Sequence, residues 1–230
     1  MTREVSQDRF ARLIECATRV FIECGYRRTQ MAEVATAMGV AKGTLYNYVE
    51  SKEGLFDLVA RCADRQDLSA VASTFPVPAP EPGSTLLYVR EQLVQTQSMA
   101  TLSAALKRKR VRDASAELEA IVTELYDLLA RNRSGITLID RSARDYPELA
   151  KLWLEARSGL LSLLENYLKS RIASSSLQSV PDKKAAARYI LEATTFWAVH
   201  RHWDLRPDSI PESTARDTVV QFIVRALAAG

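Results

Sequence analysis

The stretch TQMAEVATAMGVAKGTLYNYVESK, residues 29–52, decides the fold of this 230-residue chain. In residues 31–38, apolar side chains recur at helical spacing, and Gly39 follows where a left-handed residue ends a helix sharply. A second apolar set follows in residues 40–49. The pattern predicts two short helices joined by a tight turn. This is the helix-turn-helix arrangement, whose second helix enters the DNA major groove.

The outer face of the second predicted helix consists of the residues that do not belong to its apolar, core-facing set. Their side chains are short or form hydrogen bonds: Lys42, Gly43, Thr44, Tyr46 and Asn47. Such a face is too polar for a protein core and suits contacts to bases and phosphates. Spacing alone would equally fit an ordinary corner between two helices, so the assignment to DNA depends on which residues these are.

The run GTLYNYVESKEGLF, residues 43–56, resembles the signature of the TetR family of transcriptional repressors. In that family the recognition helix ends in an aromatic pair, and a Ser-Lys-Glu after a short turn opens the next helix. The resemblance covers residues 10–59 and is only architectural beyond them. It implies an all-α fold with an N-terminal three-helix helix-turn-helix domain and a C-terminal helical domain for ligand binding and dimerisation.

The resemblance also implies a set of DNA-contacting positions. They are Arg28, Thr29, Gln30, Ala41, Lys42, Gly43, Thr44, Tyr46, Asn47, Tyr48 and Lys52. We expect Thr44, Tyr46 and Asn47 to face bases or their flanking phosphates. Arg28, Thr29, Tyr48 and Lys52 are expected to contact the sugar-phosphate backbone of the DNA. Two positions depart from the family pattern. Gln30 and Ala41 stand where Ser or Thr usually caps a helix, a contribution of about 1 kcal/mol each.

Composition is that of an ordinary globular chain, with 47% hydrophobic and 26% charged residues. No apolar run reaches membrane-spanning length, and the N-terminus lacks an apolar signal core, so we expect no membrane partner and a cytoplasmic location. The net charge of +3 discriminates little. The basic run KRKRVR, residues 107–112, is interpreted as a solvated turn in preference to a nucleic-acid site.

Domain organisation follows from the helix pattern. Residues 1–50 are predicted to form the DNA-binding domain, and residues 51–230 the ligand-binding and dimerisation domain. Ser51 is expected to cap a connecting helix over residues 52–72. The segment FPVPAPEPG, residues 75–83, must be extended or irregular because of its prolines. It is interpreted as a stiff connector in preference to a partner-docking motif.

A single helix is expected over residues 84–107, and its residues 92–106 carry no charge although several are polar. That composition fits a helix beside a buried, partly polar cavity, or a central helix whose polar groups pair with neighbours. The predicted ligand-binding residues are Gln92, Thr96, Met99, Ser103, Tyr126, Trp153, Phe196, Trp197 and His200. The expected effector is a small organic molecule of lipophilic or amphipathic character.

The last two predicted helices, residues 182–204 and 211–229, are apolar on more than one side, which indicates a second burial surface. In the resembled family these helices form the four-helix bundle of a homodimer. The predicted interface residues are Tyr189, Ala193, Ala215, Val219, Phe222, Ile223 and Ala226. Closure of a monomer's core is the alternative interpretation.

Catalysis is not expected. The chain has two histidines and lacks HExxH, a Cys or His cluster at metal spacing, and a glycine-rich phosphate loop, so no metal site or cofactor is predicted. We therefore predict a ligand-responsive repressor that binds a palindromic double-stranded DNA operator as a homodimer. The alternative is an effector-independent DNA-binding or architectural protein of the same fold.

Overall fold

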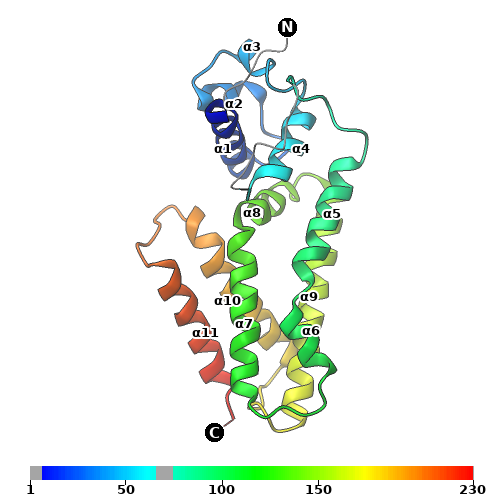
Figure 1. The fold of residues 1–230 in the computed structure, drawn as a ribbon, viewed down its shortest axis with the longest axis vertical. Coiled ribbons are helices and arrows are strands. Elements are labelled where there is room, and N and C mark those ends of the chain that lie inside the picture. The colour runs from blue at the N-terminus through cyan, green and yellow to red at the C-terminus, as the bar shows by residue number, and fades with distance from the viewer. Residues whose placement is uncertain (1–6, 66–74, 230) are drawn as a thin grey trace. The chain divides into compact units, whose positions relative to one another are not determined.

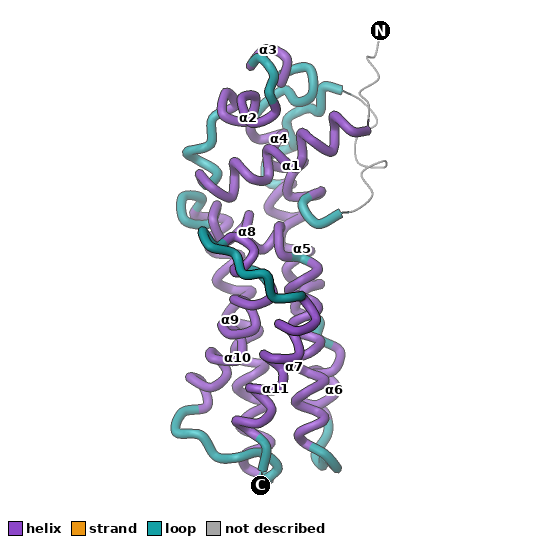
Figure 2. The backbone as a smooth tube through the Cα atoms, turned by 90° about the vertical axis from the view of Figure 1, so that its left-hand side faces the viewer, coloured by secondary structure: helices purple, strands orange, loops and turns teal. Residues whose placement is uncertain are grey.

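The computed structural model describes residues 7–65 and 75–229, without the side chains of residues 7, 96 and 97. The described chain consists of helices and connecting loops (Figures 1 and 2), which confirms the predicted all-α fold class. Contacts divide the chain into two compact units, Met1–Leu93 with Ser134–Trp153 and Val94–Arg133 with Leu154–Gly230. This is a division by packing, so the predicted functional boundary near residue 50 stays a prediction.

The first unit contains the helix-turn-helix and the helices around it. Its elements are α1 (Gln7–Cys24), α2 (Met31–Met38), α3 (Lys42–Leu45), α4 (Lys52–Cys62), most of α5 (Ser84–Gln97), α8 (Arg133–Ser142) and the start of α9 (Pro147–Ala173). Leu13 of α1, Val34 of α2 and Leu45 of α3 are fully buried, because the three helices enclose one apolar core.

The turn between α2 and α3 forms as the sequence predicts. Gly39 has a φ of 70°, the left-handed conformation that ends α2. The N–H of Val40 then donates to the carbonyl oxygen of Ala35 at 2.9 Å, which satisfies a helix-end carbonyl and turns the chain into α3. The predicted cap of α4 is also present, because the hydroxyl of Ser51 accepts from the N–H of Gly54 at 3.0 Å.

Two helix boundaries in the first unit differ from the predictions. Helix α4 ends at Cys62, and the expected continuation to residue 72 runs into residues 66–74, which lie outside the described chain. Residues 132–135 have a turn-like composition in the sequence, but α8 begins at Arg133. The carboxylate of Asp64 accepts from the N–H groups of Ser134 and Gly135 at 2.8 and 2.7 Å. These donors would otherwise be unsatisfied at a helix start.

The second unit is a helical bundle around α7 (Ala114–Arg131). The other members are α6 (Ala100–Lys107), most of α9, α10 (Lys183–Ala198), the short 3₁₀ helix η1 (His200–Trp203) and α11 (Glu212–Leu227). Helix α7 packs on α6, α10 and α11, and its Ile121 and Leu125 are fully buried. The predicted helix over residues 182–204 divides into α10 and η1 at Val199.

The prediction of a single helix over residues 84–107 is wrong, because this part of the chain forms two helices, α5 and α6. The carboxylate of Glu124 on α7 accepts from the N–H groups of Ala100 and Thr101, both at 2.9 Å. A carboxylate at this point favours the start of a new helix. Met99, immediately before it, is buried.

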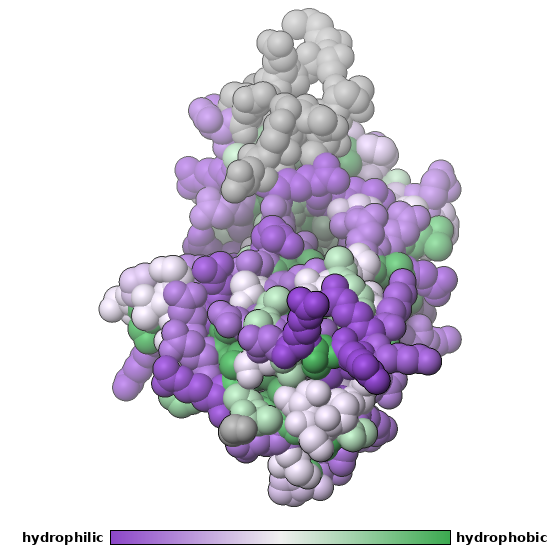
Figure 3. Space-filling view, turned by 60° about the horizontal axis from the view of Figure 1, so that its bottom comes forward, coloured by the Kyte–Doolittle hydropathy of each residue, from purple (hydrophilic) through white to green (hydrophobic). Residues whose placement is uncertain are grey.

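One end of the second unit is held by a buried ion pair. Nε of Arg171 on α9 donates to Glu117 of α7 at 2.7 Å, and the two side chains are 2% and 5% exposed. Arg171 also donates to the carbonyl oxygens of Ala105 and Arg108, where α6 ends. Four bases of the basic run, Lys107–Arg110, are exposed around it, and Figure 3 shows hydrophilic side chains gathered over this end. The interpretation as a solvated turn is in keeping with that exposure.

Helix α11 begins in a polar network centred on Glu212. Its carboxylate accepts from Tyr126 at 2.9 Å, Arg133 at 3.0 Å and Arg201 at 2.8 Å. Burial alone would raise the pKa of Glu212, but the hydrogen bond from Tyr126 and the two guanidinium groups outweigh it and hold the pKa below its ordinary value.

A pH dependence of stability follows from this network. Because the pKa of Glu212 is lower in the folded than in the unfolded state, its contribution is complete above the ordinary value of 4.5 and is lost as the pH falls below it. We expect Glu212→Gln to lower stability at pH 7 and to make unfolding less sensitive to acid. Thermal unfolding between pH 7 and 3 measures this, with Glu119→Gln, exposed on the same unit, as the control. Equal acid sensitivity of wild type and Glu212→Gln would contradict the assignment.

In the part of the chain that the structure describes, no helix combines the length and apolar character needed to cross a lipid bilayer.

Candidate nucleic-acid interface

The recognition segment is α3 with the turn that follows it. One side faces the core, where Leu45 is fully buried and Tyr48 is 6% exposed. The other side presents Lys42, Tyr46 and Asn47, of which the tyrosine is 41% exposed, to solvent. Gly43 and Ala41 are also exposed, and Thr44 is half-buried between the two sides. The predicted polar face is therefore accessible to a duplex.

The N-termini of α2 and α3 lack the hydroxyl caps usual at these positions, as the sequence predicts. Ala41 has no polar side chain to offer. At α2, the compensating group is Glu33, whose carboxylate accepts from the backbone N–H of Gln30 at 2.8 Å. The Gln30 side chain is exposed. A carboxylate in the first turn stabilises the helix dipole, so α2 keeps an ordered start without a hydroxyl cap.

Two of the predicted DNA-contacting side chains point inward. Thr29 is 2% exposed, and its hydroxyl donates to the carbonyl oxygen of Gly25 at 2.7 Å. Tyr48 is buried against the core, as stated above. These side chains pack within the domain, and their contact with DNA stays a prediction. Arg28 is exposed, and its Nε donates to the carbonyl oxygen of Cys24 at 2.8 Å.

Lys52 has partners within the domain. Its ammonium donates to the carbonyl oxygens of Arg27 and Thr29 at 3.1 and 3.4 Å and lies 4.9 Å from the ring centre of Tyr26. Lys52 therefore holds the turn between α1 and α2 as well as providing charge. Lys42, exposed at the start of α3, is the more accessible cation for a phosphate.

Tyr26 is a residue that the sequence interpretation missed. Its ring lies 4.8 Å from that of Phe56 and 5.1 Å from that of Tyr146, and its hydroxyl donates to Glu53 at 3.3 Å. Burial, together with the neighbouring carboxylate, raises the pKa of Tyr26 to about 12. Beside it, Asp145 accepts from the N–H of Arg27 at 3.2 Å. The contacts from residues 145 and 146 come from far along the chain, and no local pattern indicates them.

The predicted ligand-binding residues are distributed over both units. Gln92 and Trp153 belong to the first unit, and the indole of Trp153 donates to Asp140 at 3.1 Å. In the second unit Met99 is buried, Ser103 is exposed, and Trp197 and His200 are half-buried. Phe196 is 43% exposed. The side chain of Thr96 lies outside the described part of the chain. The assignment of these residues to a ligand stays a prediction.

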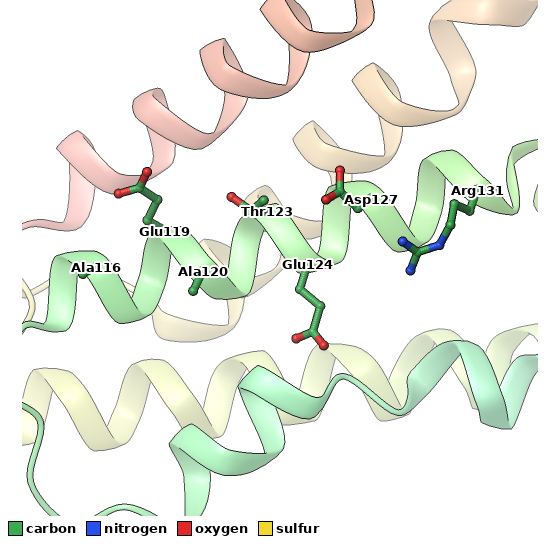
Figure 4. Close-up of a pocket in the computed structure, with 7 residues that line it drawn as sticks. All are labelled: Ala116, Glu119, Ala120, Thr123, Glu124, Asp127 and Arg131. Carbon is green, nitrogen blue, oxygen red and sulfur yellow. The ribbon is translucent and has the colours of Figure 1, made fainter.

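Tyr126 lines a groove of about 410 Å³ between α7 and α11, together with Arg133, Glu212 and Arg216. A second groove, of about 520 Å³, runs along α7 (Figure 4). Glu119, Glu124 and Asp127 are among its lining residues, and Figure 4 shows Glu119 and Glu124 pointing to opposite sides of the helix. Such a lining is too acidic for the lipophilic effector that the sequence suggested.

The predicted dimer residues fall into two groups. Ala215, Val219 and Ile223 are 1–4% exposed and form part of the chain's own core. Tyr189 and Phe222 are 65% and 71% exposed, Ala226 is exposed, and Ala193 is half-buried. Phe222 and Ala226 also line a groove of about 490 Å³ on the outer side of α11. Of the predicted interface residues, only this second group is accessible to a partner subunit.

Among the described residues, no group of three or more His, Cys, Asp or Glu side chains is arranged to hold a metal ion.

Comparison with known proteins bears on the first unit most directly. Residues 13–59 match the sequence profile of the family described as "Bacterial regulatory proteins, tetR family". Over 53 residues the chain is 43% identical to the uncharacterized HTH-type transcriptional regulator YhgD of Bacillus subtilis (strain 168). That match covers 23% of this chain and 28% of YhgD, so it spans less than a third of the relative's length.

Solved structures resemble the chain over nearly its whole length. A bacterial regulatory protein of the tetR family from Rhodococcus RHA1 has 18% identity and a TM-score of 0.55, over 98% of this chain and 100% of that one. The ketosteroid transcriptional regulator KstR2 of Mycobacterium tuberculosis has 16% identity and a TM-score of 0.55, over 99% and 98%. At these identities the similarity shows a common fold.

Proposed function

We propose that this chain is a ligand-responsive transcriptional repressor of the tetR family, whose sequence profile residues 13–59 match. In this proposal a homodimer binds a palindromic operator, in the cytoplasm, and a small organic molecule releases it. The observation that supports DNA reading is the exposed polar face of Lys42, Tyr46 and Asn47, backed by the buried Leu45 and Tyr48. A rigid scaffold that presents short polar side chains is the arrangement by which a recognition helix reads the major groove.

Dimerisation is supported by the exposed aromatic side chains of α10 and α11. Tyr189, Phe196 and Phe222 are 43–71% exposed, and large apolar side chains on neighbouring helices mark interaction surfaces. Two copies of the DNA-binding domain on one dimer would read two half-sites related by two-fold symmetry. Their spacing would be about 34–36 Å or a multiple of it, one turn of the duplex.

Release by an effector requires a ligand that prefers one arrangement of the dimer. A small molecule can weaken operator binding only if it binds better to the conformation whose recognition helices do not match the half-sites. A typical coupling of about 1–3 kcal/mol would change operator affinity roughly 5- to 150-fold. The uncharged sequence around the junction of α5 and α6, with the buried Met99, supports a binding region for an organic molecule there.

Lys42 is expected to contact a phosphate. Lys42→Ala should weaken binding to all duplexes alike and reduce the slope of log affinity against log salt by about one, because one fewer counterion is released. Salt titrations by fluorescence anisotropy measure this. Lys184→Ala, which removes an exposed charge from α10, is the matched control and should leave the slope unchanged. A changed base preference with an unchanged slope would contradict the role of Lys42.

Asn47 is expected to contact a base. Asn47→Ala should cost about 1–3 kcal/mol on the preferred operator and relax the choice of base at one position of each half-site. Affinities for the operator and its single-base variants measure both effects. An equal loss on every duplex would assign Asn47 to the phosphate backbone instead.

A further inference from the structure

The proline-rich segment that precedes α5 is hydrogen-bonded to the end of the recognition segment. The N–H of Val77 donates to the carbonyl oxygen of Tyr48 at 2.8 Å, and the N–H of Glu50 donates to the carbonyl oxygen of Val77 at 3.0 Å. Together these bonds make a parallel bridge between Val49 and Val77. Residues 75–78 are called the strap below.

Side chains and close backbone packing seat the strap on neighbouring helices. The ring of Phe75 lies 5.5 Å from that of Phe10 on α1 and 6.3 Å from that of Tyr48. Gly54 of α4 is buried under the strap, and a Cβ added there would lie 2.8 Å from the carbonyl oxygen of Pro78. Atoms do not approach that closely without a shift, so the absence of a side chain at Gly54 allows the strap its present position.

The recognition segment has little regular structure of its own. Helix α3 spans four residues, Lys42–Leu45, and the N–H groups of Asn47 and Tyr48 donate to carbonyl oxygens only three residues earlier. A helix this short has almost no independent stability, and its orientation depends on outside contacts. The two backbone hydrogen bonds from the strap are such contacts, and they act just beyond the exposed Tyr46 and Asn47.

We propose that the strap is a positioning element for DNA reading. It holds the end of the recognition segment so that the exposed side chains of α3 meet bases in a fixed geometry. It also connects that segment to α5, since only residues 79–83 lie between the strap and Ser84, and two of these are prolines that stiffen the connection. A displacement at the start of α5 therefore reaches the recognition segment by a route that does not pass through α4. This inference rests on the proposed function.

The test uses backbone chemistry. Val77→Pro removes the N–H that donates to Tyr48, whereas Val77→Ala retains both backbone hydrogen bonds. Ala79→Pro is the matched proline control, because the N–H of Ala79 donates to no group in the described chain. The probes are a duplex that the wild-type protein selects from a random-sequence pool and a scrambled duplex of the same length. We expect Val77→Pro to bind the selected duplex roughly 3- to 10-fold more weakly, the value of one hydrogen bond.

Binding to the scrambled duplex should stay within about twofold, because it depends on phosphate charge rather than on base geometry. Val77→Ala and Ala79→Pro should match the wild type on both duplexes. A purely structural defect would lower both affinities together and would overturn the inference, as would a Val77→Pro variant with wild-type discrimination.

Gly54→Ala tests the positioning role of the strap if Val77→Pro does not fold. The new methyl group must displace the strap, while alanine favours the α4 helix more than glycine does. Discrimination between the two duplexes should fall although the unfolding midpoint is kept. Unchanged discrimination overturns the strap inference and leaves the proposed function standing. If the wild-type protein selects no duplex at all, the proposed function falls and the strap inference falls with it.

Discussion

Replacing Phe222 by aspartate is expected to convert the proposed dimer into monomers that remain folded. The side chain is 71% exposed in the single chain, so a carboxylate there costs the monomer little. In the proposed interface the same group would be buried and unpaired, once from each subunit, and each buried charge costs several kcal/mol. The dimer should weaken on the order of 100-fold or more, and operator affinity should fall with it.

Sedimentation analysis and circular dichroism together test this result. We expect a monomer with the helical content of the wild type. Ser162→Asp, which adds the same charge at an exposed position of α9, is the control and should remain dimeric. A dimeric Phe222→Asp protein would place the interface elsewhere. Ile223→Asp is not a useful probe, because Ile223 is 3% exposed and the substitution would disrupt the core of its own chain.

Replacing Glu117 by glutamine is expected to cause the largest loss of stability. The guanidinium of Arg171 is 2% exposed and would lose the carboxylate at 2.7 Å that balances its charge. Removing one partner of a buried pair typically costs about 3–5 kcal/mol. For a chain of this length such a loss lowers the unfolding temperature by on the order of 10 °C.

The double variant Glu117→Leu with Arg171→Met separates the unpaired charge from the loss of packing. Buried pairs can often be replaced together at little cost. Here recovery should be partial, since Arg171 also donates to the carbonyl oxygens of Ala105 and Arg108, which end α6. Glu119→Gln, an exposed carboxylate one half-turn away, should change stability by less than about 0.5 kcal/mol. A similar small effect of Glu117→Gln would contradict the assigned role of the pair.

Features governed by neighbouring residues could be predicted from the sequence. The turn at Gly39 follows from one residue's conformational freedom, and the cap of α4 from the position of Ser51. The start of α7 after Asp113 has the same kind of local cause, since its carboxylate accepts from the N–H of Ala116. The all-α fold follows because such signals agree along the chain.

Features set by distant residues could not be predicted. Asp64 starts α8 across 70 positions of sequence, and Glu124 divides α5 from α6 across 24. The hydrogen bond from Val77 to Tyr48 is of the same kind. The sequence of a proline-rich segment indicates a connector and does not indicate which distant residue it contacts.

At the candidate DNA site, the residue types predicted the exposed face but not the direction of every side chain. Thr29 and Tyr48 carry polar groups yet lie in the core, because the hydroxyl of Thr29 has a partner at Gly25 and the ring of Tyr48 packs beside Phe75. On α11, adjacent apolar residues have opposite environments, Phe222 exposed and Ile223 buried. Periodicity identifies two apolar sides of a helix, but only packing tells which side the chain itself covers.

The central claim is that this chain reads a palindromic DNA sequence as a dimer. The most direct measurement selects duplexes from a random-sequence pool and then determines the stoichiometry and salt dependence of binding to the selected site. We predict an inverted repeat bound by two chains, with affinity that falls steeply as salt rises and a marked loss when one half-site is scrambled. Equal affinity for every duplex, or a single chain bound to an isolated half-site with full affinity, would contradict the account.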